Sequence, residues 1–154
     1  MKGTYTIVVE CKSGGYAVFG RLGRTRLQAG WYVYTGSAMG VGAASLERRI
    51  RRHEKHSKNI RWHIDYLTSK PGCLVRGVVY VVSKRRLECN INQHISEGLK
   101  LLPVLPRIGA TDCNCPGHLL GPSNLNAEAL LGHLANIYRR VEPRHAPMTV
   151  RSSD

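Results

Sequence analysis

Arg49 and His53 lie four residues apart in a basic stretch, residues 44–56, in which the spacing of Leu46 and Ile50 predicts a helix. Side chains at this spacing project from one helix face. A guanidinium group can clamp a phosphate through paired hydrogen bonds. The cationic neighbours of His53 disfavour its charged form, which leaves a nitrogen that can accept a proton near pH 7. The pair therefore suits phosphate chemistry, with Arg49 as the clamp and His53 as a general base or base relay.

The other side chains of this helix are mostly basic. We expect Arg48, Arg51, Arg52 and Lys55 to be solvated and to steer a nucleic-acid backbone. Lys and Arg number 23 against 10 Asp and Glu, a formal charge of +13, which is typical of a protein that meets polyanions. No apolar run approaches the roughly 20 residues of a spanning helix, and no basic helix carries an aromatic face. A nucleic acid is therefore the expected partner, and a membrane is not.

The chain has 154 residues, of which 42% are hydrophobic. This length and composition predict one domain, which we place at residues 1–140. The N-terminus moves at once into a strand pattern, so we expect no signal peptide and a cytoplasmic location. Five cysteines are an odd number without the density of a secreted scaffold, and we expect reduced thiols. Residues 141–154, with two prolines and a polar end, are expected to form a disordered tail.

Hydrophobic periodicity and turn residues predict mixed secondary structure. The predicted elements are strands at residues 4–11, 16–20, 31–36 and 73–83, and helices at residues 44–56, 62–69, 86–99 and 126–140. The first two strands are expected to form a hairpin, and Asn124 or Asn126 is expected to cap the last helix. This order is not the strand–helix alternation of a parallel sheet. It predicts an α+β fold with a small antiparallel sheet flanked by helices.

Three ordered motifs resemble the opening motifs of the GIY-YIG nuclease superfamily. They are Gly3-Thr4-Tyr5, Tyr34-Thr35-Gly36 and Arg49-Ile50-Arg51-Arg52-His53. The run from GWYVYTGSA through RRIRRH to WHIDYL, with the later LEC and DCNCPGHL, is similar to an uncharacterised, mainly prokaryotic branch, some of whose members are fused to endonuclease III-type repair enzymes. The resemblance covers roughly residues 3 to 120. It implies a DNA nuclease that uses Mg²⁺ or Mn²⁺.

The resemblance also implies roles for two tyrosines and one glutamate. Tyr5 and Tyr34 would stand on adjacent strands at the site, where one orients the attacking water and the other supports it. A tyrosine is an unfavourable general base, because its reference pKa of ~10 would have to fall by about three units. Such a fall requires roughly 4 kcal/mol of differential stabilisation of the phenolate. Which of Tyr5, Tyr34 and His53 takes the proton stays open. Glu88 stands where the family places its metal-binding glutamate, although a first-turn glutamate can also simply complement a helix dipole.

The WHIDYL stretch holds a second candidate metal ligand, Asp65. His63 and Asp65 are two residues apart, so they do not share a helix face and are a poor metal-binding pair. We expect Trp62 to pack with the apolar residues of the stretch. The polar members are expected to brace the site or to contact nucleic acid.

Cys113, Cys115 and His118, with Cys89 as a possible fourth member, offer ligands for zinc. The C-x-C-x-x-H spacing is tighter than the usual two-residue gap between cysteine ligands, so we favour free thiols that brace a turn, with zinc as the alternative. A third interpretation makes Cys113 a nucleophile, but no base and orienting acid can be named for it.

The leading hypothesis is a metal-dependent endonuclease acting on DNA in repair or in the processing of unusual DNA structures. The alternative is a non-catalytic nucleic-acid-binding module on the same fold. It is favoured by the lack of the asparagine with which many superfamily members close the site, since Asn90 and Asn92 come too early. A third hypothesis is a zinc-stabilised adaptor for a DNA-repair protein.

Overall fold

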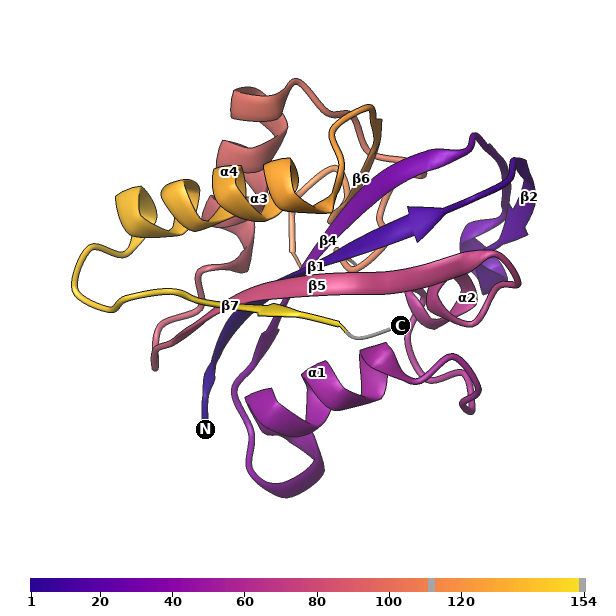
Figure 1. Cartoon of the computed structure of the whole chain (residues 1–154). Helices are drawn as coiled ribbons and strands as arrows, with labels where there is room; N and C mark the ends of the chain where they lie inside the picture. The colour runs from indigo at the N-terminus through magenta and orange to yellow at the C-terminus, as the bar shows by residue number, and fades with distance from the viewer. Residues whose placement is uncertain (111–112, 153–154) are drawn as a thin grey trace.

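The computed structural model of the protein describes residues 1–110 and 113–152. Within these residues, a five-stranded antiparallel sheet in the order β6-β4-β1-β5-β7 forms the centre, with helices on both faces (Figure 1). Its strands are β1 (Gly3–Cys11), β4 (Gly30–Ala38), β5 (Cys73–Val82), β6 (Leu119–Ser123) and β7 (Met148–Arg151). The predicted α+β class is confirmed.

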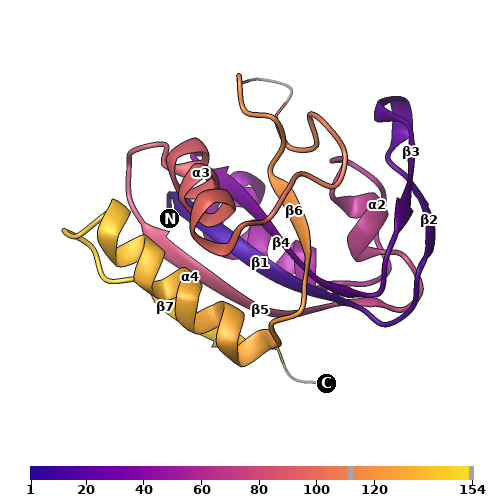
Figure 2. The same ribbon diagram turned by 90° about the horizontal axis from the view of Figure 1, so that it is seen from above.

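The helices divide between the two sides of the sheet. They are α1 (Leu46–Glu54), α2 (Asp65–Thr68), α3 (Glu88–Leu99) and α4 (Ala127–Val141), with short 3-10 turns at Gly20–Leu22 and Gly42–Ala44. In Figure 1, α3 and α4 lie above the sheet and α1 lies below it. A separate ribbon of β2 (Gly15–Val18) and β3 (Arg24–Leu27) stands with α2 at one end of the sheet (Figure 2). Among the described residues, no helix combines the length and apolar character needed to span a membrane.

The central strand β1 contributes to two cores. Alternate side chains of a strand point to opposite faces, so Tyr5, Ile7 and Val9 pack with α1 and α2, whereas Val8 packs with α3 and α4. We call these two sides the α1 face and the α4 face. All of these β1 side chains are buried, and full burial of a Val or Ile side chain stabilises a fold by roughly 1.5–3 kcal/mol.

The helices are shorter than predicted at several ends. The predicted helix at residues 44–56 is α1 at Leu46–Glu54, and the one at 62–69 is reduced to the single turn Asp65–Thr68. The predicted start at residue 86 is two residues early, because α3 begins at Glu88. Asn126 is confirmed as the cap of α4, since its Oδ1 accepts a hydrogen bond of 3.0 Å from the backbone N–H of Ala129.

The predicted hairpin of residues 4–11 with 16–20 is wrong. β1 pairs with β4 and β5, and β2 pairs instead with β3, a strand that the sequence reading missed. The sequence of β3 is RTRL, which is too polar to be recognised by a hydrophobic pattern. β6 was also missed, because its short run LLGPS contains a glycine and a proline.

The predicted disordered tail is wrong for the described residues. The chain continues in α4 to Val141 and returns as β7, which pairs with β5 from Tyr80↔Met148 to Gly77↔Arg151. Between them, Glu142 is 1% exposed and accepts a hydrogen bond of 3.0 Å from the backbone N–H of Arg144. Low apolar content suggested disorder, but an edge strand can be held by backbone hydrogen bonds alone. Residues 153–154 of the predicted tail lie outside the described residues.

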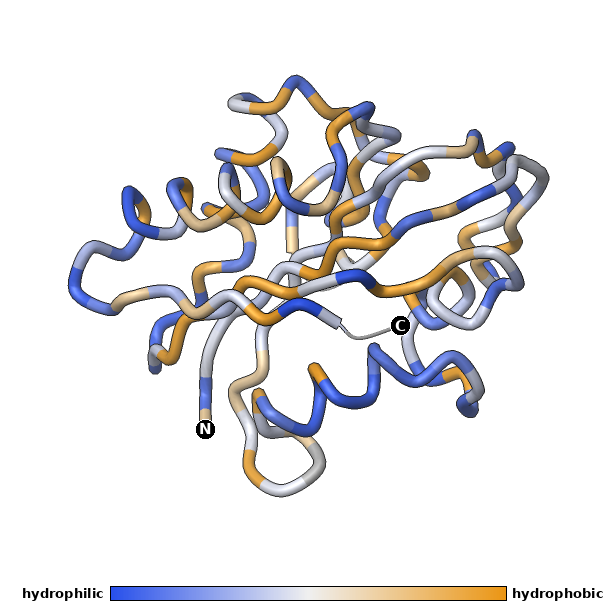
Figure 3. The backbone as a smooth tube through the Cα atoms, viewed as in Figure 1, coloured by the Kyte–Doolittle hydropathy of each residue, from blue (hydrophilic) through white to orange (hydrophobic). Residues whose placement is uncertain are grey.

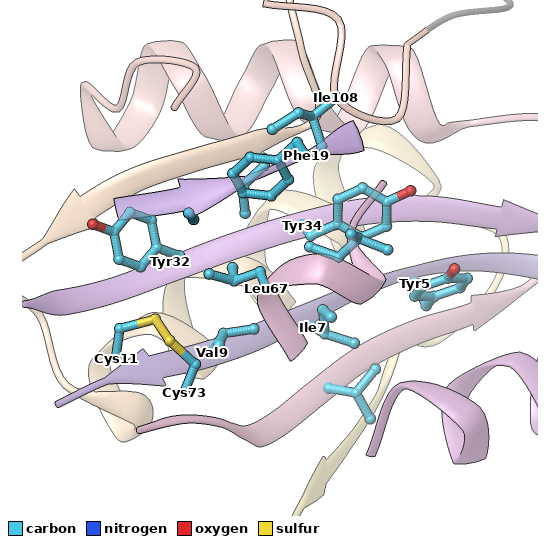
Figure 4. Close-up of a cluster of buried hydrophobic side chains, with 14 of the residues drawn as sticks. Tyr5, Ile7, Val9, Cys11, Phe19, Tyr32, Tyr34, Leu67, Cys73 and Ile108 are labelled. Carbon is cyan, nitrogen blue, oxygen red and sulfur yellow. A yellow bond between two sulfur atoms is a disulfide. The ribbon is translucent and has the colours of Figure 1, made fainter. Parts of the chain in front are cut away.

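The expectation of five reduced thiols is wrong for two of them. Cys11 and Cys73 form a disulfide between directly paired positions of β1 and β5 (Figure 4). They are 62 residues apart in the chain, so only the strand register reveals that they meet. Cys89, Cys113 and Cys115 are free thiols.

Candidate active site

Tyr5 and Tyr34 meet where β1 and β4 lie side by side. The register pairs Tyr5 with Gly36 and Ile7 with Tyr34, which places both rings on the α1 face (Figure 4). A Cβ atom added at Gly36 would lie 2.7 Å from the Tyr5 hydroxyl oxygen and 3.3 Å from Cε2 of Tyr34. Glycine at position 36 therefore lets the two rings approach each other.

Tyr32 shares this face but takes no part in the site. Its ring lies toward the disulfide end of the core, and its hydroxyl points away from Tyr34 in Figure 4. The hydroxyl donates a hydrogen bond of 2.6 Å to the carbonyl oxygen of Gln28. Tyr32 is therefore a packing residue.

A cavity of ≈ 940 Å³ opens beside the two tyrosines. Seven residues that the sequence analysis selected line it, namely Tyr5, Tyr34, Arg49, Trp62, His63, Glu88 and His118. Three arginines that were not selected, Arg21, Arg61 and Arg86, also line it. Glu88 is the one acidic side chain among the described lining residues. The cavity is therefore strongly cationic, and the only earlier signal of this was the net charge of the chain.

Arg49 reaches the cavity from α1. Its Nη1 donates a hydrogen bond of 2.6 Å to the carbonyl oxygen of Ser37, and its guanidinium carbon lies 5.0 Å from the centre of the Trp62 ring. Its Nε is buried and has no hydrogen-bond partner in the described part of the chain. The guanidinium is thus oriented by the protein while Arg49 lines the cavity, which suits recognition of an anion.

His53 sits behind Tyr5 and does not line the cavity. It is 1% exposed, and its Nε2 lies 2.7 Å from the Tyr5 hydroxyl oxygen. With the proton of the neutral ring on Nδ1, Nε2 accepts the hydrogen bond that the hydroxyl donates. The expected general-base position of His53 is therefore refined, because the imidazole can reach a substrate only through Tyr5.

Burial dominates the proton affinities of this pair. Burial, followed by the positive charge of Lys58, lowers the pKa of His53 to about 3, so the ring is neutral near pH 7. Burial and the neighbouring Tyr34 hydroxyl raise the pKa of Tyr5 well above its usual value, against the lowering influence of Arg49. Neither group is poised as a base near pH 7 in the unliganded protein.

Glu88 is the first residue of α3 and lines the cavity, and only one of its two carboxylate oxygens lies near a partner. Oε1 lies 3.6 Å from Nη1 of Arg86, whose side chain is 64% exposed. Oε2 is buried without a hydrogen-bond partner among the described residues. An unpaired buried carboxylate oxygen is costly, and a carboxylate oxygen is the ligand that Mg²⁺ prefers. A divalent cation at Glu88 would have this one carboxylate as its acidic protein ligand among the described lining residues and would take most other ligands from water.

Asp65 is not available as the second metal ligand. Its Oδ1 accepts a hydrogen bond of 2.8 Å from Arg52, and its Oδ2 accepts one of 2.9 Å from the backbone N–H of Trp62 and a second from the next amide back along the chain. Burial alone would raise the pKa of Asp65, but these hydrogen bonds outweigh it and lower the pKa. The carboxylate braces the loop that carries Trp62, as expected for the polar members of this stretch.

The basic residues of α1 fall into two groups. Arg48, Arg51 and Lys55 are exposed, and Figure 3 shows α1 as a largely hydrophilic helix. Arg52 instead combines its bond to Asp65 with a 2.6 Å hydrogen bond to the carbonyl oxygen of Asn59, and its guanidinium stacks 4.6 Å from the Trp62 ring centre. Arg52 is therefore built into the protein, whereas the exposed three remain candidates for contact with nucleic acid.

A second constellation forms where α3 meets the segment before β6. The ligand atoms of Cys89, Cys113, Cys115 and His118 all lie within 4.8 Å of one another, so these four residues could hold a metal ion. Burial, then hydrogen bonds with the other thiols, raises the pKa of Cys89, which makes it a poor thiolate nucleophile by itself. His118 Nε2 lies 3.8 Å from the sulfurs of both Cys89 and Cys113, a shared arrangement rather than a dedicated nucleophile–base pair. Asp112, the first residue of the DCNCPGHL motif, lies outside the described residues.

The chain belongs to the family described as "Domain of unknown function DUF123", whose pattern matches residues 4–142. The match takes in the strands of the tyrosines, the helix of Arg49 and the cysteine segment. No curated protein and no solved structure matches the chain.

Proposed function

We propose that this DUF123 protein is a GIY-YIG-type nuclease that hydrolyses phosphodiester bonds in DNA with the help of Mg²⁺ or Mn²⁺. The observation that carries the proposal is the buried, unpartnered carboxylate oxygen of Glu88 in a cavity otherwise lined by arginine, histidine and tyrosine. A lone acid in a cationic cavity suits a metal ion and a phosphate together, because each balances the other's charge. The ordered tyrosine, arginine and histidine motifs support the same chemistry.

Each residue of the cavity has one task in this proposal. Arg49 holds the scissile phosphate through the part of its guanidinium that lines the cavity. Tyr5 orients the attacking water and relays its proton inward to Nε2 of His53, which lies 2.7 Å away. Tyr34 supports the water from the adjacent strand. Glu88 would hold the divalent cation, which when bound supplies positive charge to the phosphate and the leaving oxygen.

The test is cleavage of nicked, branched and damaged DNA with Mg²⁺ or Mn²⁺. We expect Glu88→Ala and Arg49→Ala each to lower cleavage by about 10²- to 10³-fold, the scale of losing one preorganised electrostatic partner. Matched controls are Glu97→Ala, an exposed glutamate on α3, and Arg140→Ala, an exposed arginine on α4. Unchanged activity in both site variants would overturn the assignment.

The second candidate function is a non-catalytic nucleic-acid-binding module. The low pKa of His53, about 3, favours it, because the imidazole is a weak proton acceptor in the unliganded protein, and the raised pKa of Tyr5 points the same way. A pure binder would show steep salt-dependent affinity for DNA and no product after long incubation with metal. Product formation that depends on Glu88 decides for the enzyme.

A further inference from the structure

Four soft ligand atoms converge on one point from two separate parts of the chain. Cys89 lies in the first turn of α3, and Cys113, Cys115 and His118 lie 24 or more residues later, before β6. His118 Nε2 is 3.8 Å from the sulfur of Cys89 and 3.8 Å from that of Cys113. A tetrahedral zinc ion, with Zn–S of about 2.3 Å and Zn–N of about 2.0 Å, separates a sulfur from a nitrogen ligand by about 3.5 Å and two sulfurs by about 3.8 Å. The four ligand atoms, all within 4.8 Å of one another, need only a small inward movement to reach this spacing.

The ligand types favour zinc over the hard cation proposed at Glu88. Three sulfurs and one imidazole nitrogen are soft donors that suit Zn²⁺, whereas Mg²⁺ prefers oxygen. Four protein ligands leave no open position, which is the mark of a structural rather than a catalytic zinc. The tight C-x-C-x-x-H spacing does not prevent this, because Cys89 completes the set from a different element.

The segment around the cluster is shaped to present these ligands. The Arg107 side chain donates a hydrogen bond of 2.8 Å to the carbonyl oxygen of Cys113, and its backbone N–H donates one of 2.8 Å to that of Pro116. The His118 backbone N–H donates one of 2.7 Å to the carbonyl oxygen of Ile108. Outer hydrogen bonds of this kind hold metal ligands in place.

One side chain joins this segment to α3 near the cluster. Asn92 is 4% exposed, and its Nδ2 donates a hydrogen bond of 2.8 Å to the carbonyl oxygen of Gly117, the residue before His118. Between α3 and β6 the chain has no helix and no strand longer than an isolated bridge in its described part. A long irregular segment needs cross-links to hold one conformation, and a metal is an effective one.

We propose that Cys89, Cys113, Cys115 and His118 bind one structural Zn²⁺, which fixes the start of α3 and thereby positions Glu88 in the cavity. Glu88 directly precedes Cys89, and His118 itself lines the cavity beside it. The second half of this proposal rests on the proposed function, and the first half does not. In this proposal Glu88 binds the Mg²⁺ or Mn²⁺ ion, and its neighbour Cys89 binds the Zn²⁺ ion.

The first measurement is the zinc content of the purified full-length protein by elemental analysis. We expect one zinc per chain, retained in Glu88→Ala and in His133→Gln, an exposed histidine of α4, and lost in Cys115→Ser. Cobalt added to zinc-free wild-type protein should give the absorption of a thiolate-bound tetrahedral ion. Absence of both zinc and the cobalt spectrum in folded wild-type protein overturns the site, whatever the variants do.

The second measurement separates the metal site from the nuclease proposal. If Glu88 is positioned by zinc, chelation of zinc should lower the apparent affinity for Mg²⁺ at least tenfold while leaving circular dichroism of the sheet unchanged. Zinc bound one to one with no cleavage in any condition keeps the zinc site and refutes the nuclease. Cleavage with unchanged Mg²⁺ dependence after zinc removal refutes the positioning of Glu88.

Discussion

Buried tyrosine hydroxyls have different surroundings on the two faces of the sheet. On the α4 face, Tyr138 is fully buried and its hydroxyl lies 2.7 Å from Thr6 Oγ1, which in turn lies 2.8 Å from the hydroxyl of Thr35. On the α1 face, Tyr5 is equally buried, but its hydroxyl leads to His53 and to a cavity. The hydroxyl of Tyr138 belongs to a closed hydrogen-bond network, whereas Tyr5 lies between the buried His53 and the cavity.

The buried polar atoms without partners make the same distinction. Among the described residues, the ionisable groups with such an atom are Arg49, His53 and Glu88, all at or directly behind the cavity. The other two such atoms belong to the uncharged Thr4 and Asn92. Natural proteins satisfy most buried polar groups, so a cluster of unsatisfied ionisable ones marks a place where a ligand is expected. The unpartnered ionisable groups therefore gather around the cavity, to which β1, α1 and α3 contribute, whereas the hydroxyls of Tyr138, Thr6 and Thr35 form a closed network.

The two buried tyrosines give the sharpest test of this comparison. We expect Tyr5→Phe to lower cleavage by about 10²- to 10⁴-fold, the scale of a lost proton-transfer group, and to lower the free energy of unfolding by about 1 kcal/mol through loss of its bond to His53. Tyr138→Phe should leave cleavage unchanged and lower the free energy of unfolding by about 1 kcal/mol, the value of one hydrogen bond. Single-turnover cleavage and urea unfolding measure the two effects. Equal effects of the two variants on cleavage would remove the distinction between the faces.

The pH dependence of stability probes His53. Because its pKa falls from 6.5 in the unfolded chain to about 3 in the folded protein, its contribution is full above pH 6.5 and is lost as the pH falls toward 3. The change across this window is on the order of 5 kcal/mol, since each pKa unit corresponds to about 1.4 kcal/mol. Urea unfolding at several pH values should show a flatter profile for His53→Gln than for the wild-type protein. A parallel profile would contradict the burial of a neutral imidazole.

Asp65→Asn tests the brace of the α1 face. We expect a loss of about 1.5–3 kcal/mol in the free energy of unfolding, because the bonds from Arg52 and two backbone amides are charge-assisted. The exposed pair of Arg151 and Glu128 offers a control, since Glu128→Gln removes a similar contact in solvent and should cost much less. Similar costs for both variants would show that Asp65 is not a brace.

The smallest effect concerns the exposed arginines. Replacing Arg48 and Arg51 by Gln should reduce the slope of log affinity against log salt for DNA by about 2, one phosphate contact for each residue. Arg139 and Arg140, exposed on α4, allow the same charge change on the other face, and their Gln variant should leave the slope nearly unchanged. An equal loss from both pairs would mean that binding follows net charge rather than the α1 face.

Much of the α1 face could be read without a structure. The alternation in residues 31–34 put Tyr34 on one side of its strand with Tyr32, and the four-residue spacing put Arg49 and His53 on one side of their helix. Such local periodicities follow directly from strand and helix geometry. They predicted the fold class and the placement of Arg49 and His53 on one helix face, whereas Tyr5, Tyr34 and Glu88 were selected from the family resemblance. They did not predict that His53 is screened from the cavity by Tyr5.

The tertiary structure alone decided which distant residues meet. The register of β1 with β5 joins Cys11 to Cys73, β7 completes the sheet from a stretch that reads as a tail, and α3 brings Cys89 to the cluster before β6. Arg86 reaches the cavity in the same way. These contacts depend on strand pairing and packing across long sequence separations, where one residue of register changes the face on which a side chain lies. Composition and local spacing do not determine the strand register or the packing of distant segments.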